Sequence, residues 1–157
     1  MEAILKPVLN LLNELYVGVN AGPTWVIDPK PGHGFIAAIK TIDARQASTP
    51  IVKGGSTIAA HTEHLRWSIY FALEFYKGNR PEGEWDKSWL VREVDEAQWA
   101  KLQMDLQEAY DKLKTAIESV TDWSDPLMLQ GTIALLPHAA YHLGAVKQQL
   151  LYVQSQP

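Results

Sequence analysis

The sequence predicts an all-α fold: a four-helix bundle with a long crossover between its first and second helices. Three observations support this prediction. Four long segments place apolar residues at spacings of three and four, the pattern of helices that bury one face. The stretch 21–34 is rich in Pro and Gly and cannot be regular. Together with a short helical segment at about 35–47, it makes the connection at 20–55 too long for a simple turn.

The first two long helices are predicted at about residues 2–19 and 56–77. Pro7 falls within the first turns of the first helix, where proline does least harm. Gly54 and Gly55 break the chain before the second helix, and Gly78 is well placed to end it. The inner stripe predicted for the second helix contains His61, His64, Leu65, Ser68, Ala72 and Phe75.

The third helix has the clearest predicted start in the chain. Asp95 is a suitable N-cap, and Gln98 three residues later completes a capping box. Val94 is placed to pack against Trp99 as a hydrophobic staple. The helix is followed by a predicted turn at 121–126.

The fourth helix is predicted from about 127 or 130 to 153, and it contains Pro137 directly before His138. A proline inside a helix removes one hydrogen bond and frees the carbonyl of the residue four positions earlier, so we expect a kink. The kink is either a tolerated irregularity or a device that aims His138.

Composition limits the possible functions. A chain of 157 residues predicts one domain, 1–157, and its net charge of -4 without a basic run argues against nucleic acid and anionic membranes as partners. The absence of Cys excludes disulfides, thiolate ligands and a cysteine nucleophile, so any thiol in the chemistry must come from a substrate. The first residues lack signal-peptide features, and no apolar run approaches the ~18 residues of a membrane span. We therefore expect a cytoplasmic protein.

The most informative motif is the pair of histidines in His138-Ala-Ala-Tyr-His142. Residues four apart lie on one face of a helix, and the neighbours of this pair are largely apolar. A buried polar ring without a partner is penalised by roughly 1–3 kcal/mol. A transition metal would use both rings at once, which predicts a metal site. The alternative is a pair of core histidines that are hydrogen-bonded to other side chains.

The second predicted helix offers a third ligand. His61 and His64 are three apart, so both can face inward. We favour His64, which lies deeper in the helix, and keep His61 as an alternative or additional ligand. His33, in the Pro/Gly-rich loop, is expected at the surface. Three neutral imidazoles would leave one position for water or substrate on zinc, or more on nickel, iron or manganese.

Missing motifs narrow the chemistry and leave no catalytic residue identified. Ala139 stands where a zinc protease of the His-Glu-x-x-His type keeps its general base. No histidine has Glu three residues before it, so the ligand pairs of di-iron carboxylate bundles are absent. The chain also lacks Gly-x-Gly-x-x-Gly, P-loop and Gly-x-Ser-x-Gly motifs.

These motifs resemble those of a known family. The stretch His138-Ala-Ala-Tyr-His142-Leu-Gly-Ala-Val is similar to the fourth-helix motif of the DinB/YfiT-like superfamily, in which His-x-x-x-His-x-Gly supplies two metal ligands. The stretch 56–65 resembles the second-helix motif of that family, and His64 is the better match to its ligand. The loop from Gly78-Asn-Arg-Pro to Trp85 and Trp89 is similar to the family's connection between helices two and three. The resemblance covers essentially the whole chain.

The resemblance implies a four-helix bundle, often a homodimer, with a divalent metal ion held by three histidines. Relatives of that family include transferases that use low-molecular-weight thiols and a thiol-dependent isomerase. The leading hypothesis is therefore transfer of a small thiol to a small electrophile, with the thiol as cosubstrate. We expect Trp67, Tyr70, Trp85 and Trp89 at the pocket mouth and expect Tyr141 to pack rather than act.

Other functions remain open at this stage. A non-catalytic bundle could bind a ligand or partner and keep a structural metal, which would normally have a fourth protein ligand. If His61 and His64 both ligate, the site is closed and catalysis is disfavoured. A hydrolase that activates water at the metal would share every ligand with the transferase. A haem-binding bundle is the most distant alternative.

Overall fold

The computed structural model describes residues 2–156 of the chain, and the side chains from residue 5 onward. Every regular element in that range is helical, which confirms the all-α prediction. The elements are α1 (Glu2–Tyr16), α2 (Phe35–Ile39), α3 (Ala44–Ala47), α4 (Ile58–Tyr76), the 3-10 helix η1 (Trp85–Trp89), α5 (Glu96–Ser119) and α6 (Pro126–Ser155). No helix within 2–156 is both long and apolar enough to cross a membrane.

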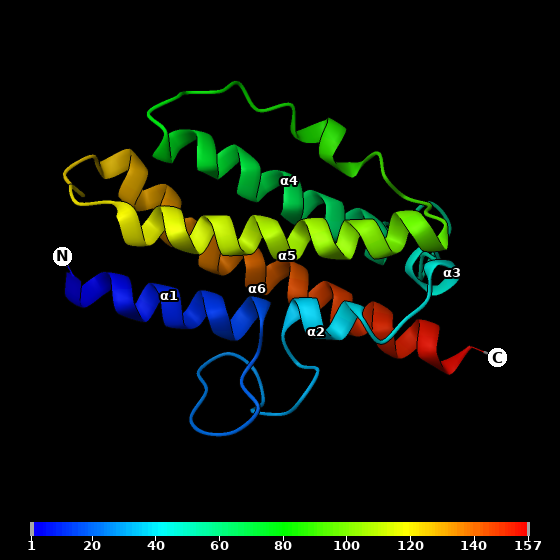
Figure 1. Ribbon diagram of the computed structural model, residues 1–157. Coiled ribbons are helices and arrows are strands. Elements are labelled where there is room, and N and C mark those ends of the chain that lie inside the picture. Colours follow the sequence, from blue (N-terminus) through cyan, green and yellow to red (C-terminus); the bar gives the residue numbers. More distant parts are fainter. Residues whose placement is uncertain (1, 157) are drawn as a thin grey trace.

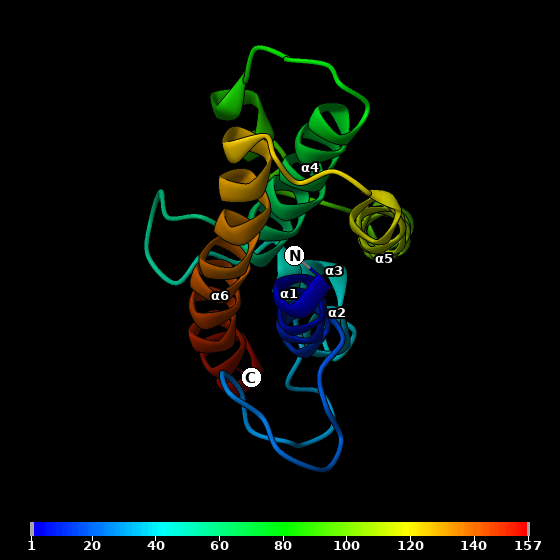
Figure 2. The ribbon, with the colours of Figure 1, turned by 90° about the vertical axis from the view of Figure 1, so that its left-hand side faces the viewer.

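The four long helices lie side by side and run in two directions (Figures 1 and 2). Helices α1 and α6 run one way, and α4 and α5 run the other. Helix α4 packs against both α5 and α6, while α1 packs against α6 and α5. The core between them is apolar, and its largest fully buried side chains are Trp99, Tyr16, Phe35, Leu12, Leu15, Ile39, Ile58, Leu65, Ile69, Leu106, Leu113 and Ile117.

The connections differ from the predicted crossover. Residues 17–57 form a long connection, but the helices that it joins, α1 and α4, run in opposite directions (Figure 1). The segment that returns along the length of the helices is 77–95, because α4 and α5 run in the same direction. This second long connection arches over α4 and carries η1.

The predicted short helix at 35–47 is two helices, α2 and α3. The chain leaves the helix after Ile39 because Asp43 acts as a new N-cap, and its carboxylate accepts a hydrogen bond from the backbone of Gln46. The Gln46 side chain in turn accepts from the backbone of Asp43, which completes a capping box. A local capping signal therefore interrupts a segment that composition alone joined into one helix.

Side-chain caps begin three of the long helices, and the one predicted from the sequence is among them. The capping box of Asp95 and Gln98 is present at the start of α5. Thr57 caps α4, and Gly78, with a φ of 84°, follows its last turn. Helix α6 begins with Pro126 after the cap Asp125 and continues through Pro137 to Ser155. The kink at Pro137 stays a prediction.

The connection after α1 is attached to that helix by a buried carboxylate. Glu14 is only 3% exposed, and its oxygens accept hydrogen bonds from the backbone N–H groups of Trp25, Val26 and Ile27. The two ends of the loop meet where a Cβ on Gly34 would lie 2.3 Å from the backbone of Val17. This irregular segment is thus ordered by three charge-assisted bonds and one close backbone approach.

We predict that Glu14→Gln destabilises the protein by roughly 1–3 kcal/mol. The amide lacks the negative charge that strengthens the three bonds to Oε1, and it turns an N–H donor toward the backbone N–H of Trp25, which now donates to Oε2 as well. Chemical denaturation would measure the loss. The control is Glu118→Gln, which changes an exposed carboxylate on α5. Equal unfolding midpoints for the two variants would contradict this role of Glu14.

Candidate metal centre

Four of the five histidines meet at the contact between α4 and α6. His61 and His64 come from α4, and His138 and His142 come from α6. Three of them turn the same ring nitrogen toward one point: the Nε2 of His138 lies 3.1 Å from the Nε2 of His64 and 3.0 Å from that of His142. His64 and His142 are buried and His138 is partly buried. These three lie close enough together to hold one metal ion.

The structure separates the two candidates on α4. His61 lies behind His142, with the Nδ1 atoms of the two rings 2.9 Å apart. The other ring nitrogen of His61 lies 2.9 Å from the hydroxyl oxygen of Ser56. Both nitrogens of His61 are therefore engaged away from the point where the other three rings converge. His64 is the residue of this pair that faces His138 and His142.

The orientation of His64 follows from its hydrogen-bond partner. The hydroxyl of Ser88 donates to the carbonyl oxygen of Trp85 at 2.6 Å, so it must accept from the Nδ1–H of His64, 2.7 Å away. The proton of His64 is thus assigned to Nδ1 from the network. Its Nε2 then carries a lone pair that points at His138. A hydrogen bond that sets the tautomer in this way is the usual support of a metal-binding histidine.

His142 can be held in the same way. If its Nδ1–H donates to Nδ1 of His61, then the Nε2–H of His61 donates to Ser56. In this arrangement the Nε2 atoms of His64 and His142 both present lone pairs. The Nε2 of His138 has at most one proton and cannot satisfy both.

A divalent cation fits this donor set, because it would accept all three lone pairs at once. Imidazole nitrogens bound to zinc lie ~2.0–2.1 Å from the ion, which in a tetrahedral arrangement separates them from one another by about 3.3 Å. The observed separations of 3.0 and 3.1 Å need only a small outward movement. The donor set contains nitrogen alone, which suits zinc, nickel, iron or manganese without selecting one.

Burial keeps these imidazoles neutral. Desolvation lowers the pKa of His61 and that of His64 to about 4, and neighbouring histidines add to the effect at His64. Desolvation lowers the pKa of His138 as well. At His142, desolvation together with the other three rings lowers the pKa to about 2. Neutral imidazole is the form that binds metal, so the rings are ready to ligate at neutral pH.

The long connection after α4 closes one side of the site. Trp89 of η1 stacks on the ring of His64, with centroids 4.2 Å apart, and meets His61 edge to face with centroids 5.2 Å apart. Arg80, near the start of the connection, pairs with Asp125 at the start of α6 at 2.8 Å. Near its other end, the carbonyl of Arg92 accepts a hydrogen bond from the hydroxyl of Thr57 at 2.8 Å. Both ends are thus tied to helices that carry the histidines.

A cavity of about 410 Å³ begins at His64 and His138 and extends between α4 and α6. Its other lining residues are Ser68, Phe71, Ala72, Phe75, Tyr76, Trp85, Leu127, Met128, Gly131, Thr132, Ala134 and Leu135. Two of the three candidate ligands therefore border a space large enough for a small molecule.

Of the four aromatic residues expected at the pocket mouth, two lie at the site and two do not. Trp85 lines the cavity and Trp89 covers the histidines. Trp67 packs behind Trp85, with ring centroids 4.8 Å apart, and does not line the space. Tyr70 lies elsewhere, beside Arg66 and Lys112. The expectation is wrong for Trp67 and Tyr70, because helical spacing alone does not say which aromatic ring the connection above α4 will contact.

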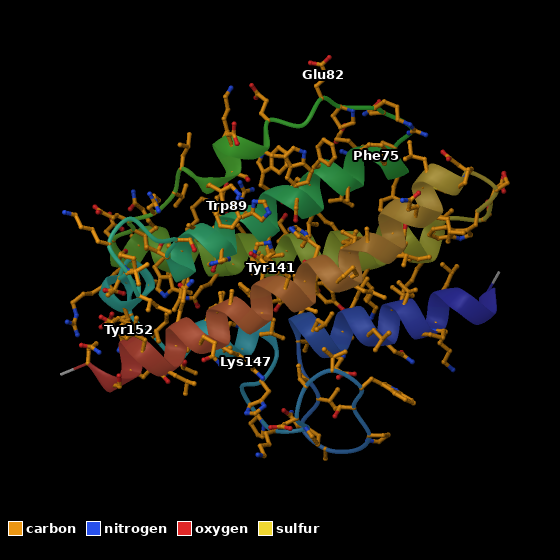
Figure 3. The ribbon with its side chains drawn as sticks, turned by 180° about the vertical axis from the view of Figure 1, so that it is seen from behind. Phe75, Glu82, Trp89, Tyr141, Lys147 and Tyr152 are labelled. Atoms are coloured by element: carbon orange, nitrogen blue, oxygen red, sulfur yellow. The ribbon has the colours of Figure 1, made fainter. Side chains whose placement is uncertain are left out.

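Two other residues considered in the sequence analysis lie outside the site, and two residues that belong to it were not considered. Tyr141, labelled in Figure 3, is 70% exposed, its ring centroid lies 5.0 Å from that of His142 in an edge-to-face arrangement, and it does not line the cavity. His33 is partly buried near Asp28, far in sequence from the cluster and not part of it. Sequence reasoning missed Ser56 and Ser88. The only signal for Ser88 is its position between Trp85 and Trp89, since irregular segments have no periodicity.

Comparisons with models of protein families, with curated proteins and with solved structures give no match for this chain.

We predict that His64→Ala abolishes stoichiometric metal binding, whereas His61→Ala keeps one ion per chain with an affinity about 10–100-fold lower, as for residues that orient a ligand from behind. Metal content by mass spectrometry and competition with a chelating dye would measure both effects. His33→Ala is the matched control and should bind like the wild type. Equal losses in the His61 and His64 variants would contradict the assignment of different roles.

Proposed function

We propose that this chain is a metal-dependent enzyme of the DinB/YfiT-like superfamily that transfers a low-molecular-weight thiol to a small electrophile. In this proposal the four long helices form a four-helix bundle, and His64, His138 and His142 hold one divalent ion. The observation that carries the proposal is that three Nε2 atoms converge beside a cavity while His61 faces away. Three protein ligands with an open position are typical of catalytic sites, and four are typical of structural ones.

The chemistry follows from what the chain has and lacks. The bound ion would supply positive charge that favours the thiolate form of a thiol at neutral pH. The chain has no Cys, so the sulfur must come from a cosubstrate. The thiol gives its proton to solvent, its sulfur forms a bond to the electrophilic carbon, and the leaving group departs with the electrons of the broken bond.

The residues around the ion have separate tasks in this reaction. Ser88 orients His64, and His61 orients His142. Trp89 covers the ring of His64 and keeps water from that side. The cavity provides room for the electrophile on the side bordered by His64 and His138. These residues hold the ligands in position and shield the site from water, which suits a reaction that needs no protein nucleophile.

Two alternatives are less well supported. Hydrolysis at the same centre would benefit from a general base, but no carboxylate is among the residues that line the cavity. A purely structural metal would call for a fourth protein ligand, and His61 is engaged with Ser56 and His142 instead. The resemblance also extends the proposal to a homodimer, which light scattering on the purified protein would test.

We expect the purified protein to bind one divalent ion per chain when it is offered zinc, nickel, iron or manganese. With cobalt(II) as a spectroscopic substitute, a small thiol should change the visible absorption spectrum, because sulfur would join the three nitrogens. The His138→Ala variant should show neither result. No metal in the folded wild type would leave these residues as core histidines. A bound cobalt ion whose absorption spectrum does not change when thiol is added would support a structural metal.

A further inference from the structure

The cavity beside the histidines has walls that are almost entirely apolar. Phe71 and Phe75 line it from α4, Met128 and Leu135 from α6, and Trp85 from the connection above. No Asp, Glu, Lys or Arg is among its lining residues. A charged group placed there would lose its hydration without finding an opposite charge.

The hydroxyl groups in the wall offer no free proton. Ser68 donates to the carbonyl oxygen of Leu65 at 2.8 Å, and Thr132 donates to that of Met128 at 2.8 Å. Because the proton of Thr132 is used, the hydroxyl of Tyr76 must donate in the 2.6 Å contact between them. All three protons are thus committed within the protein. A carboxylate or phosphate would find no hydroxyl donor here, and burial of an anion without enough donors costs free energy.

The cavity is also elongated. Helices α4 and α6 run in opposite directions, so His64 of α4 faces His138 of α6 at one end, and Phe75 of α4 and Leu127 of α6 line the cavity toward the other. Eleven residues separate the two ends on each helix, 64 to 75 and 127 to 138. At a rise of 1.5 Å per residue this corresponds to about 16 Å. Figure 3 shows Phe75 well along α4 from Trp89, which covers the histidines.

We propose that this cavity binds an uncharged, apolar molecule with an aromatic or extended hydrocarbon portion, and that it excludes anions and cations. Its hydrocarbon part lies toward Phe75 and Met128, and its polar or reactive end lies at His64 and His138. As a statement about the electrophile, the inference rests on the proposed thiol transfer. Binding of the apolar molecule itself does not require the metal. Charged parts of a thiol cosubstrate then lie outside this cavity.

The test is calorimetric titration of the metal-free full chain with 2-naphthalenemethanol, 2-naphthoate and 2-naphthylmethylamine, which share one ring system and differ in charge. We expect the alcohol to bind at one site per chain. We expect the two ions to bind at least about tenfold more weakly, because their charge is desolvated without a partner. Metal-free protein is used so that a carboxylate cannot gain affinity by binding the ion.

Two glycines of α6 provide matched variants. A Cβ at Gly131 or at Gly144 would meet no atom within 4 Å, so a side chain can begin at either position without a clash. Gly131 lines the cavity and Gly144 does not. Gly131→Leu should weaken binding of the alcohol by at least about tenfold, since the new side chain takes the place of the ligand, and Gly144→Leu should bind as the wild type does. Ala134→Met provides a second obstruction from another lining position.

Each outcome decides between the inference and the function on which it depends. Binding of naphthoate as tight as that of the alcohol, or unchanged binding in both Gly131→Leu and Ala134→Met, would overturn the apolar site. Failure of the alcohol to bind a protein that does bind metal and thiol would overturn the apolar site alone. Selective binding of the alcohol to a protein that never retains metal would support the cavity and remove the thiol transferase.

Discussion

The packing of α4 against α6 holds four imidazoles within hydrogen-bonding distance of one another in a place that water barely reaches. Such rings are costly to bury unless each nitrogen has a partner. Ser56 and His61 provide hydrogen-bond partners at one end of the cluster, and Ser88 provides one at the other end. The nitrogens that lack sufficient partners are therefore the three Nε2 atoms of His64, His138 and His142. The rest of the site depends on this distribution, because it leaves a cation as the natural partner.

The two long connections have different consequences for this centre. Glu14 holds the first part of the connection after α1 against that helix, and the end of the same connection brings Ser56 to His61. The connection after α4 carries Ser88, Trp85 and Trp89, which orient one ligand, line the cavity and cover the rings. A segment without regular periodicity thus supplies the partner of His64, a wall of the cavity and the cover over the rings.

The environment of the cavity sets the chemistry that it can accept. The cavity wall has no charged side chain and no free hydroxyl proton. It therefore favours an uncharged ligand that needs no hydrogen-bond donor from the wall. The neutral histidines at its end have pKa values lowered by the same burial. Apolar walls and a polar end are a common combination in small-molecule sites, where shape provides affinity and a few polar atoms provide orientation.

The sequence by itself determined the four long helices, the cap at Asp95, and the pairing of His138 with His142, because these depend on local spacing and on hydrogen bonds within one turn. It favoured His64 over His61 but kept both as possible ligands, because the two share one face of α4, and it expected the crossover between α1 and α4, whereas the connection that returns along the helices is 77–95. Only the tertiary structure decided these points. Which face of α4 meets α6, and where Ser88 comes to lie, depend on contacts between segments far apart in the chain.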